Sequence, residues 1–171
     1  IAELFDMPTE FMYSRFANPT CDAVEKKIAT LEGGVGAMLT SSGQSAVLCT
    51  ILNLCKAGDS VVAVSTIYGG VINLLSVTLK RMGIDCIWVS PDATPGQIRK
   101  AIRKNTKLVF GETIANPALR VLDIERFAKA AHEKGVPLVI DNTFATPALC
   151  QPLKWGADIV IHSTTKYMDG H

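Results

Sequence analysis

A chain of 171 residues, 48% of them hydrophobic and 19% charged, is long enough to bury one core of ordinary domain size. Its formal net charge of +1 gives no electrostatic basis for binding nucleic acid or an anionic membrane surface. No apolar stretch approaches the roughly 20 residues that span a bilayer, so we predict a globular domain without a membrane partner.

Short apolar, β-branched runs alternate with segments of helical period along most of the chain. Val24, Ile28 and Leu31 recur at helical spacing after an aperiodic start, which predicts a helix over residues 21–32. Beyond it we predict six strands, over residues 37–40, 60–64, 85–89, 107–110, 137–140 and 158–162, and four helices, over 44–56, 71–82, 95–104 and 124–134. This alternation predicts an α/β domain with a mostly parallel sheet between helices.

The boundaries of these elements carry their own markers. Gly58, Gly83 and Gly135 stand where glycines close helices, and Asp123 stands where a side chain caps the next one. No linker divides the chain, so we predict an N-terminal arm over residues 1–20 and one domain over residues 21–171. The start at an isoleucine and the stop at Gly170-His171 lead us to expect that both belong to a longer polypeptide.

Polar residues follow several of the predicted strands. The carboxyl ends of parallel strands share one rim of the sheet, where ligands bind in open α/β folds. The residues expected on this rim are Ser41-Ser42-Gly43-Gln44, Thr66-Ile67-Tyr68-Gly69, Glu112, Asp141-Asn142-Thr143 and Ser163-Thr164-Thr165-Lys166.

The segment over residues 41–45 is expected to follow a strand and open a helix. The free N–H groups and positive dipole end of a helix N-terminus suit a phosphate, and Gly43 would allow close backbone approach. A plain turn with a serine cap explains the same residues. Neither a G-x-G-x-x-G nor a Walker pattern is present.

Asp141 and Lys166 place a carboxylate and an amine at two further strand ends. Asp141 could pair with a protonated ring nitrogen, which makes a pyridinium an electron sink, or it could cap the following turn. Lys166 could attack an aldehyde as a buried amine, with Ser163 and Thr165 beside a phosphate, or it could be a solvated surface lysine.

Aromatic and cationic residues complete the set. Tyr68 could stack on a cofactor ring or transfer a proton, or it could be a half-buried core tyrosine. Tyr13 and Arg15 in the arm suit phosphate contact, although a structural ion pair explains the arginine equally well. A phosphate cradle, a ring stacker, a ring-nitrogen partner and a reactive lysine together fit one ligand, pyridoxal 5'-phosphate (PLP).

The histidines and cysteines indicate no metal site. His132 lacks the H-E-x-x-H spacing, and His162 alternates with apolar neighbours in a predicted strand. The five cysteines include no C-x-x-C pair, which favours small core residues in a reducing cytosol over disulfides or zinc.

In six segments the chain resembles the Cys/Met-metabolism family of PLP enzymes. They are Tyr13-Ser-Arg15-Phe-Ala-Asn18-Pro19-Thr20, Ser42-Gly43-Gln44, Tyr68-Gly69-Gly70, Glu112-Thr-Ile-Ala-Asn116-Pro117, Asp141-Asn142-Thr143 and Ser163-Thr164-Thr165-Lys166-Tyr167. The resemblance covers nearly the whole chain and keeps the family's order.

The resemblance implies a role for each segment. Tyr13 and Arg15 would reach the phosphate of a neighbouring subunit's cofactor, and Lys166 would form the Schiff base. The remaining contacts would come from Ser42, Gly43, Gln44, Ser163 and Thr165 at the phosphate, Tyr68 on the ring face, Glu112 and Asn116 on its O3′ side, and Asp141 with Thr143 at the ring nitrogen.

The family also implies a fold and an assembly. The expected fold is the aspartate-aminotransferase-like PLP fold (fold type I), in a homotetramer built from tight dimers. Family chains are longer, and their C-terminal part supplies the arginine for the substrate carboxylate. We therefore expect this chain to lack the C-terminal domain and to be inactive by itself.

Within the family, Ser41-Ser42-Gly43-Gln44 and Thr143-Phe144-Ala145-Thr146-Pro147 favour the O-acetylhomoserine sulfhydrylases, which join O-acetyl-L-homoserine and sulfide. Gly70 stands where methionine γ-lyases carry cysteine. Methionine γ-lyase and the cystathionine γ-synthases and γ-lyases remain alternatives, because the same residues serve γ-replacement and γ-elimination.

Two hypotheses lie outside these enzymes. A nucleotide-binding dehydrogenase would use a similar sheet, but the chain lacks its glycine fingerprint. A non-catalytic subunit would keep the fold, but it would have no physical need to keep Lys166, Asp141 and Tyr68 together.

Overall fold

In a computed structural model the chain divides into two compact units, Ile1–Leu39 and Thr40–His171, and the structure describes residues 13–169. The first unit contains helix α2 (Pro19–Glu32). It begins two residues before the predicted start because the Asn18 side chain accepts the N–H groups of Thr20 and Cys21, and proline is favoured in the first turn. Gly33 ends it with a left-handed φ of 73°.

The predicted strand over residues 37–40 is wrong. None of these four residues is in a strand, and the Leu39 N–H donates to the Glu25 carboxylate at 2.7 Å. A side chain of α2 therefore satisfies a backbone group that a sheet would otherwise have paired. The segment over residues 41–45 consequently does not follow a strand.

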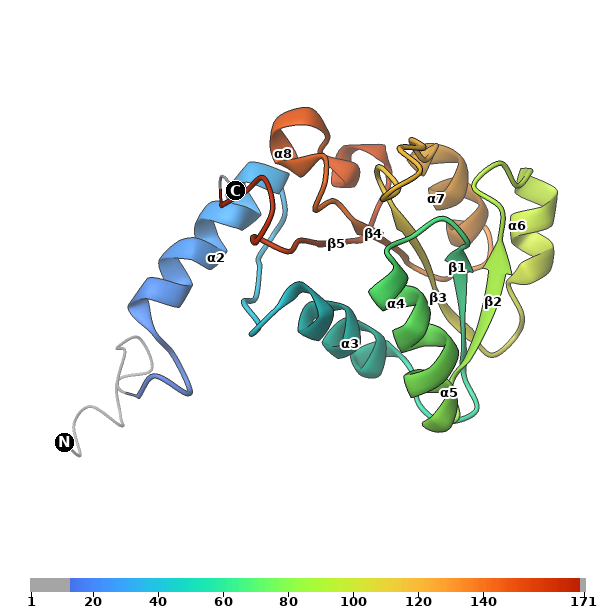
Figure 1. The fold of residues 1–171 in the computed structure, drawn as a ribbon, viewed down its shortest axis with the longest axis horizontal. Coiled ribbons are helices and arrows are strands. Elements are labelled where there is room, and N and C mark those ends of the chain that lie inside the picture. Colours follow the sequence, from blue (N-terminus) through green and yellow to red (C-terminus); the bar gives the residue numbers. More distant parts are fainter. Residues whose placement is uncertain (1–12, 170–171) are drawn as a thin grey trace. The chain divides into compact units, whose positions relative to one another are not determined.

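The second unit is built on a five-stranded sheet in which every pairing is parallel (Figure 1). This confirms the predicted α/β class with a mostly parallel sheet. The strands run in the order β2-β1-β3-β4-β5. Their bounds are β1 (Ser60–Val64), β2 (Asp85–Val89), β3 (Thr106–Glu112), β4 (Leu138–Asp141) and β5 (Ile159–Ile161).

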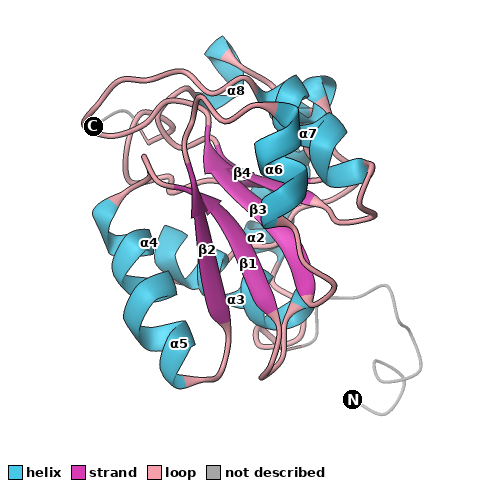
Figure 2. Ribbon diagram, turned by 90° about the vertical axis from the view of Figure 1, so that its right-hand side faces the viewer, coloured by secondary structure: helices cyan, strands magenta, loops and turns pink. Residues whose placement is uncertain are grey.

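Helices cover both faces of this sheet, as the side view shows (Figure 2). The helices are α3 (Gly43–Leu54), α4 (Gly69–Asn73), α5 (Leu79–Arg81), α6 (Pro95–Ala101), α7 (Ile124–His132) and α8 (Thr146–Leu149). The segments α4 and α5 lie on one face, with α6 and α7 on the other. Side chains such as Phe110 of β3 and Phe127 of α7, both fully buried, fill the core.

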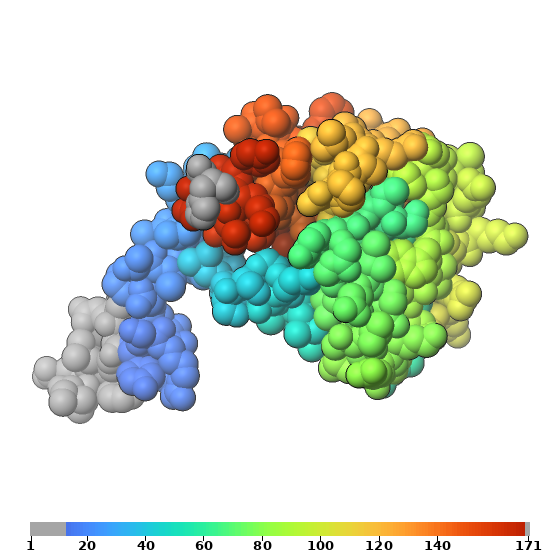
Figure 3. Space-filling model, in the orientation of Figure 1, coloured from blue at the N-terminus to red at the C-terminus, as the bar shows by residue number. Residues whose placement is uncertain are grey.

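The helix predicted over residues 71–82 is longer and less regular than expected. It starts at Gly69, because the Tyr68 carbonyl already accepts the N–H groups of Val71 and Ile72. A π-helical turn, Leu74–Thr78, separates α4 from α5. Together these turns, drawn in green in the space-filling view, form a broad part of the surface of the second unit (Figure 3).

Most of the predicted boundary markers are confirmed. Asp123 caps α7 by accepting the Arg126 N–H at 3.0 Å. Gly58, Gly83 and Gly135 take φ values of 91°, 80° and 68° in the turns after helices. Helix α8 and the 3-10 turn Pro152–Trp155 were not predicted, because four residues are too few to show a helical period.

The cysteines follow the expected pattern only in part. No disulfide joins the five, and burial raises the pKa of Cys55 to about 11 and that of Cys86 to about 12. Cys21 and Cys49, by contrast, are exposed rather than in the core. Among residues 13–169, no helix is long and apolar enough to cross a membrane.

The strand order creates a point where the chain changes direction. From β1 it moves outward to β2, and from β2 it crosses back over β1 to reach β3. In doubly wound sheets the crevice for a ligand lies at such a switch point, beyond the carboxyl ends of the strands. Here that point lies between β1 and β3, so Tyr68 and Glu112 are the predicted residues nearest to it.

Candidate cofactor site

Glu112 connects two loops at the switch point. It is the last residue of β3 and is 8% exposed. Its carboxylate accepts the Tyr68 N–H at 2.6 Å and also a backbone N–H from Asn116. The pKa of Glu112 is raised to about 7, chiefly because the carboxyl is buried. The nearby charge of Asp141 also raises the pKa, while the hydrogen bonds from the Tyr68 and Asn116 N–H groups lower it. Tyr68, Glu112 and Asn116 are thus brought together as the sequence predicts.

Asp141 lies beside Glu112 on the neighbouring strand. It ends β4, and the two residues are register partners in the parallel pair. The Asp141 carboxylate accepts the Thr143 N–H at 2.9 Å. Burial raises the pKa of Asp141, and hydrogen bonds from Thr143 and the charge of His162 lower it. A cation placed against this buried carboxylate would favour its ionised form.

The start of α3 meets the turn that follows β5. A Cβ added at Gly43 would lie 2.7 Å from the Ser163 Cβ and 3.1 Å from its Cα, so only glycine allows this approach. The Ser163 N–H donates to the Thr143 hydroxyl at 2.8 Å, which ties the same turn to the loop after β4. Ser42 caps α3 by accepting the Ser45 N–H at 3.1 Å.

Replacement of Gly43 by alanine tests this contact. The added methyl group meets the Ser163 backbone, which moves less readily than the end of a side chain. Overpacking of this kind costs about 1–3 kcal/mol, so we expect PLP affinity of the full-length protein to fall by about tenfold to a hundredfold. An absorption titration with PLP measures the change.

Gly96→Ala is the matched control for this substitution. A Cβ at Gly96, in the first turn of α6, has its nearest neighbour 3.9 Å away. Equal PLP affinity of the two variants would show that the contact between Gly43 and Ser163 does not shape the site.

Lys166 and Thr165 lie in the turn that follows β5, and both are exposed. Of the two alternatives for Lys166, the structure shows a solvent-accessible amine rather than a buried one. Tyr167 packs edge-on against Phe144 with ring centroids 5.4 Å apart. This contact holds the turn at the residue directly after the lysine.

Tyr68 and Gln44 lie next to each other at the start of α4. Tyr68 is 50% exposed, which fits a ring that offers a face to a ligand better than a core tyrosine. The Gln44 amide nitrogen and the Tyr68 ring together occupy the place that a side chain at Gly70 would take. No pattern in the sequence predicts that these two side chains meet at Gly70.

Tyr13 and Arg15 belong to the first unit, and both are exposed. The Arg15 guanidinium lies 5.3 Å from the centroid of the Tyr13 ring and 5.0 Å from that of Phe16. The contact of these residues with a neighbouring subunit's cofactor stays a prediction.

Asn142 is a residue of the site region whose role the sequence did not indicate. Its buried side chain accepts the Thr113 hydroxyl at 2.7 Å and donates to the Cys150 carbonyl at 2.9 Å. These bonds fix the loop after β4 to β3 and to the end of α8. The Asp-Asn-Thr sequence indicated only a turn.

Ionisation of Glu112 gives a prediction for stability. Its ordinary pKa is 4.5 and the folded value is about 7, so the folded protein binds the proton more tightly. The contribution of this proton to the free energy of unfolding is therefore fully present below pH 4.5. It is lost as the pH rises toward 7, by up to about 3 kcal/mol. In the cofactor-free full-length protein, this loss should appear as a fall in the thermal midpoint with rising pH, and Glu112→Gln should make that fall smaller.

Glu125→Gln, at an exposed position in the first turn of α7, controls for the loss of a carboxylate. It should leave the slope of the midpoint against pH as in the parent. Parallel slopes for the parent and Glu112→Gln would contradict the assignment of the raised pKa to Glu112.

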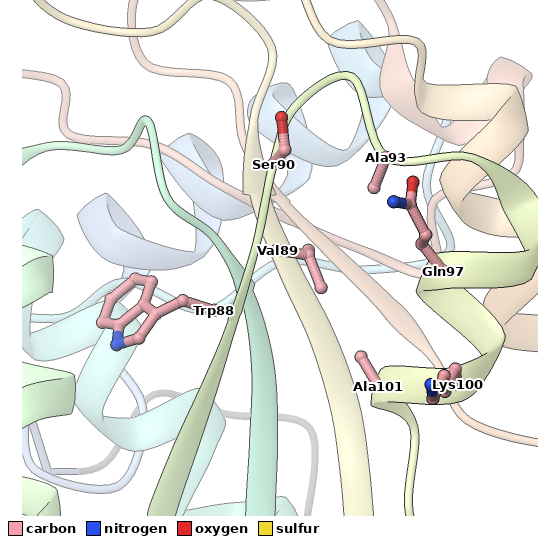
Figure 4. Close-up of a pocket in the computed structure, with 7 residues that line it drawn as sticks. All are labelled: Trp88, Val89, Ser90, Ala93, Gln97, Lys100 and Ala101. Atoms are coloured by element: carbon pink, nitrogen blue, oxygen red, sulfur yellow. The ribbon is translucent and has the colours of Figure 1, made fainter.

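A separate pocket of about 350 Å³ opens between β2 and α6 (Figure 4). None of the predicted site residues borders it. Its lining residues are Trp88, Val89, Ser90, Ala93, Gln97, Lys100 and Ala101. Among the described residues, no group of three or more His, Cys, Asp and Glu side chains is placed to hold a metal ion.

The described residues fit PLP. The carboxylate of Asp141, whose pKa burial raises, would gain from a protonated ring nitrogen placed against it, and the close approach of Gly43 to Ser163 brings the start of α3 to the turn after β5, where a phosphate would meet the helix N-terminus. The exposed ring of Tyr68 and the amine of Lys166 provide a stacking surface and a nucleophile.

Comparison with known proteins agrees with this fit. The model of the family "Cys/Met metabolism PLP-dependent enzyme" matches residues 3–171. An O-acetyl-L-homoserine sulfhydrylase from Leptospira meyeri is 49% identical over 160 residues, which are 94% of this chain and 36% of the relative. An L-methionine gamma-lyase from Fusobacterium nucleatum subsp. polymorphum is 46% identical over 162 residues, which are 94% of this chain and 41% of the relative.

A solved structure from Campylobacter jejuni, described as an O-acetylhomoserine (thiol)-lyase with N'-pyridoxyl-lysine-5'-monophosphate, is also similar. It matches with a TM-score of 0.92 and 37% identity over 99% of this chain and 42% of that one. The chain thus spans about two fifths of the length of the proteins that it matches. It has the fold of these PLP enzymes, and it belongs to the Cys/Met metabolism family of PLP-dependent enzymes.

Proposed function

We propose that the full-length protein catalyses PLP-dependent γ-replacement on O-acetyl-L-homoserine. Sulfide replaces the acetate group on the γ-carbon, and the products are L-homocysteine and acetate. The observation that carries the cofactor part of this proposal is the meeting of Tyr68, Glu112 and Asp141 at the switch point of the sheet. The choice of substrate is supported by the 49% identity to the Leptospira sulfhydrylase.

The proposal gives each group at the rim a task. Bound PLP supplies an electron-poor ring that withdraws charge from the substrate α-carbon. Lys166 holds the cofactor and then moves the α-proton, while Asp141 keeps the ring nitrogen protonated. Tyr68 covers the ring face and transfers a proton near the γ-carbon. The phosphate is held by Ser42, Gly43, Gln44, Ser163 and Thr165, with Thr143 and Asn116 beside the ring.

The same proposal extends to the assembly. We infer a cytoplasmic homotetramer in which Tyr13 and Arg15 of the first unit reach the phosphate of a neighbouring subunit. The exposure of both side chains, and their place in the first compact unit, Ile1–Leu39, rather than in the unit of the sheet, support an intersubunit role.

A methionine γ-lyase is the second candidate, because a relative of that name is 46% identical. The full-length, PLP-loaded protein is incubated with O-acetylhomoserine, with and without sulfide, and homocysteine and 2-oxobutyrate are measured. Sulfide-dependent homocysteine as the main product supports the sulfhydrylase. If 2-oxobutyrate predominates even with sulfide, the protein is a γ-lyase rather than a sulfhydrylase. If neither product forms, cystathionine-type substrates are tested next.

A further inference from the structure

The space at Gly70 is the most unusual packing feature near the candidate site. A Cβ built at this position would overlap both the Gln44 amide nitrogen and the Tyr68 ring. Gly70 lies inside α4 and does not have a positive φ, so its backbone conformation would accept any residue. The demand for glycine here comes from the neighbouring side chains and not from the backbone.

Gln44 reaches this space from a different element. It is the second residue of α3, and its side chain lies against Gly70 at the start of α4. The buried Gln44 side-chain oxygen has no hydrogen-bond partner among the described residues. Packing beside Gly70 and Tyr68 therefore has a larger part in placing this end of the carboxamide than hydrogen bonding does.

Tyr68 is consequently held from two sides. Its backbone N–H donates to the Glu112 carboxylate, which fixes the backbone of Tyr68 in the loop after β1. Its ring and the Gln44 carboxamide lie at the same place beside Gly70, both within 2.5 Å of the position that a Cβ there would take. A side chain whose direction is limited by its neighbours before a ligand arrives loses less entropy on binding.

We propose that Gly70 and Gln44 act as a coupled pair of positioning residues: the missing side chain at Gly70 makes room for the Gln44 carboxamide, which sets the Tyr68 ring for stacking on the cofactor. The inference rests on the cofactor site of the proposed function and does not depend on which substrate the enzyme uses. A side chain at position 70 displaces Gln44 or turns the ring, because both are the mobile ends of side chains.

The experiment compares Gly70→Ala with Gly69→Ala in the full-length protein. Gly69 is the adjacent residue of α4, and a Cβ there has no neighbour within 4 Å. Gly70→Ala should lower PLP affinity by up to about tenfold, as the loss of one aromatic stacking contact predicts, and should alter the visible circular dichroism of the bound cofactor. The thermal midpoints of the two cofactor-free variants should match each other, since both substitutions gain the same helix propensity.

A double variant separates coupling from simple crowding. In a Gln44→Ala background the Tyr68 ring has space to move, so adding Gly70→Ala should change affinity and dichroism much less than it does alone. Additive effects of the two substitutions would overturn the proposal, as would a Gly70→Ala protein that matches Gly69→Ala. Both measurements use PLP without substrate, so a negative substrate assay leaves them interpretable.

Discussion

Lys166→Ala in the full-length, PLP-loaded protein should reduce turnover by about 10⁴-fold or more. The substitution removes the amine that would hold the cofactor and also the group that would move the substrate proton, and a positioned acid–base group alone contributes about 10²–10⁴-fold. The exposure of Lys166 on the turn after β5 leaves the amine accessible to an aldehyde. Turnover is measured with the substrate that the product assay selects.

A second measurement identifies the attachment directly. Borohydride reduces a lysine–aldehyde adduct to a stable amine, so the parent protein should keep the mass of the cofactor after denaturation and the variant should lose it. Lys154→Ala, at an exposed lysine of the 3-10 turn, should behave like the parent in both measurements. Near-normal turnover of Lys166→Ala would refute the assignment.

Asp141→Ala should slow exchange of the substrate α-hydrogen with solvent by about 10²- to 10⁴-fold. Removing one partner of a buried charge pair costs about 3–5 kcal/mol, and here the partner would be the protonated ring nitrogen. Burial raises the pKa of Asp141, so contact with a protonated ring nitrogen would stabilise the ionised carboxylate. Exchange in deuterated buffer is followed by proton NMR.

Asp92→Asn is the control for the loss of a carboxylate in the second unit. Asp92 is on the surface, where it pairs with Arg120 at 2.6 Å, and its side chain is 66% exposed. An Asp141→Ala protein that exchanges the α-hydrogen as fast as Asp92→Asn would remove Asp141 from the reaction while leaving the assignment of Lys166 intact.

The sheet could be predicted largely because its central strands, β1, β3 and β4, are buried along most of their length. Every residue of β1 is buried, and such runs stand out in the sequence as continuous Val and Ala between polar turns. The prediction of a strand over residues 37–40 was wrong for a reason that the local sequence does not show. Its apolar residues resemble a strand, but the Leu39 N–H is satisfied by Glu25, and that pairing depends on the tertiary structure.

The rim residues that follow β1, β3, β4 and β5 could be predicted because parallel strands bring their carboxyl ends to one side, whereas the segment over residues 41–44 follows no strand. Glu112 and Asp141 were expected near each other, and the register of β3 and β4 makes them direct neighbours. The packing around Gly70 could not be predicted. It depends on two side chains, Gln44 and Tyr68, that meet only after α3 and α4 have docked.

The contact between Gly43 and Ser163 also has a consequence for biosynthesis. The two residues lie near opposite ends of the second unit's sequence, and every strand of the sheet lies between them. A nascent chain emerges from the ribosome with α3 long before β5, and contacts of such long sequence separation form late. On the proposed function, cofactor capture requires the assembled sheet of the second unit, so a time course of PLP uptake during refolding should follow the last step of sheet assembly.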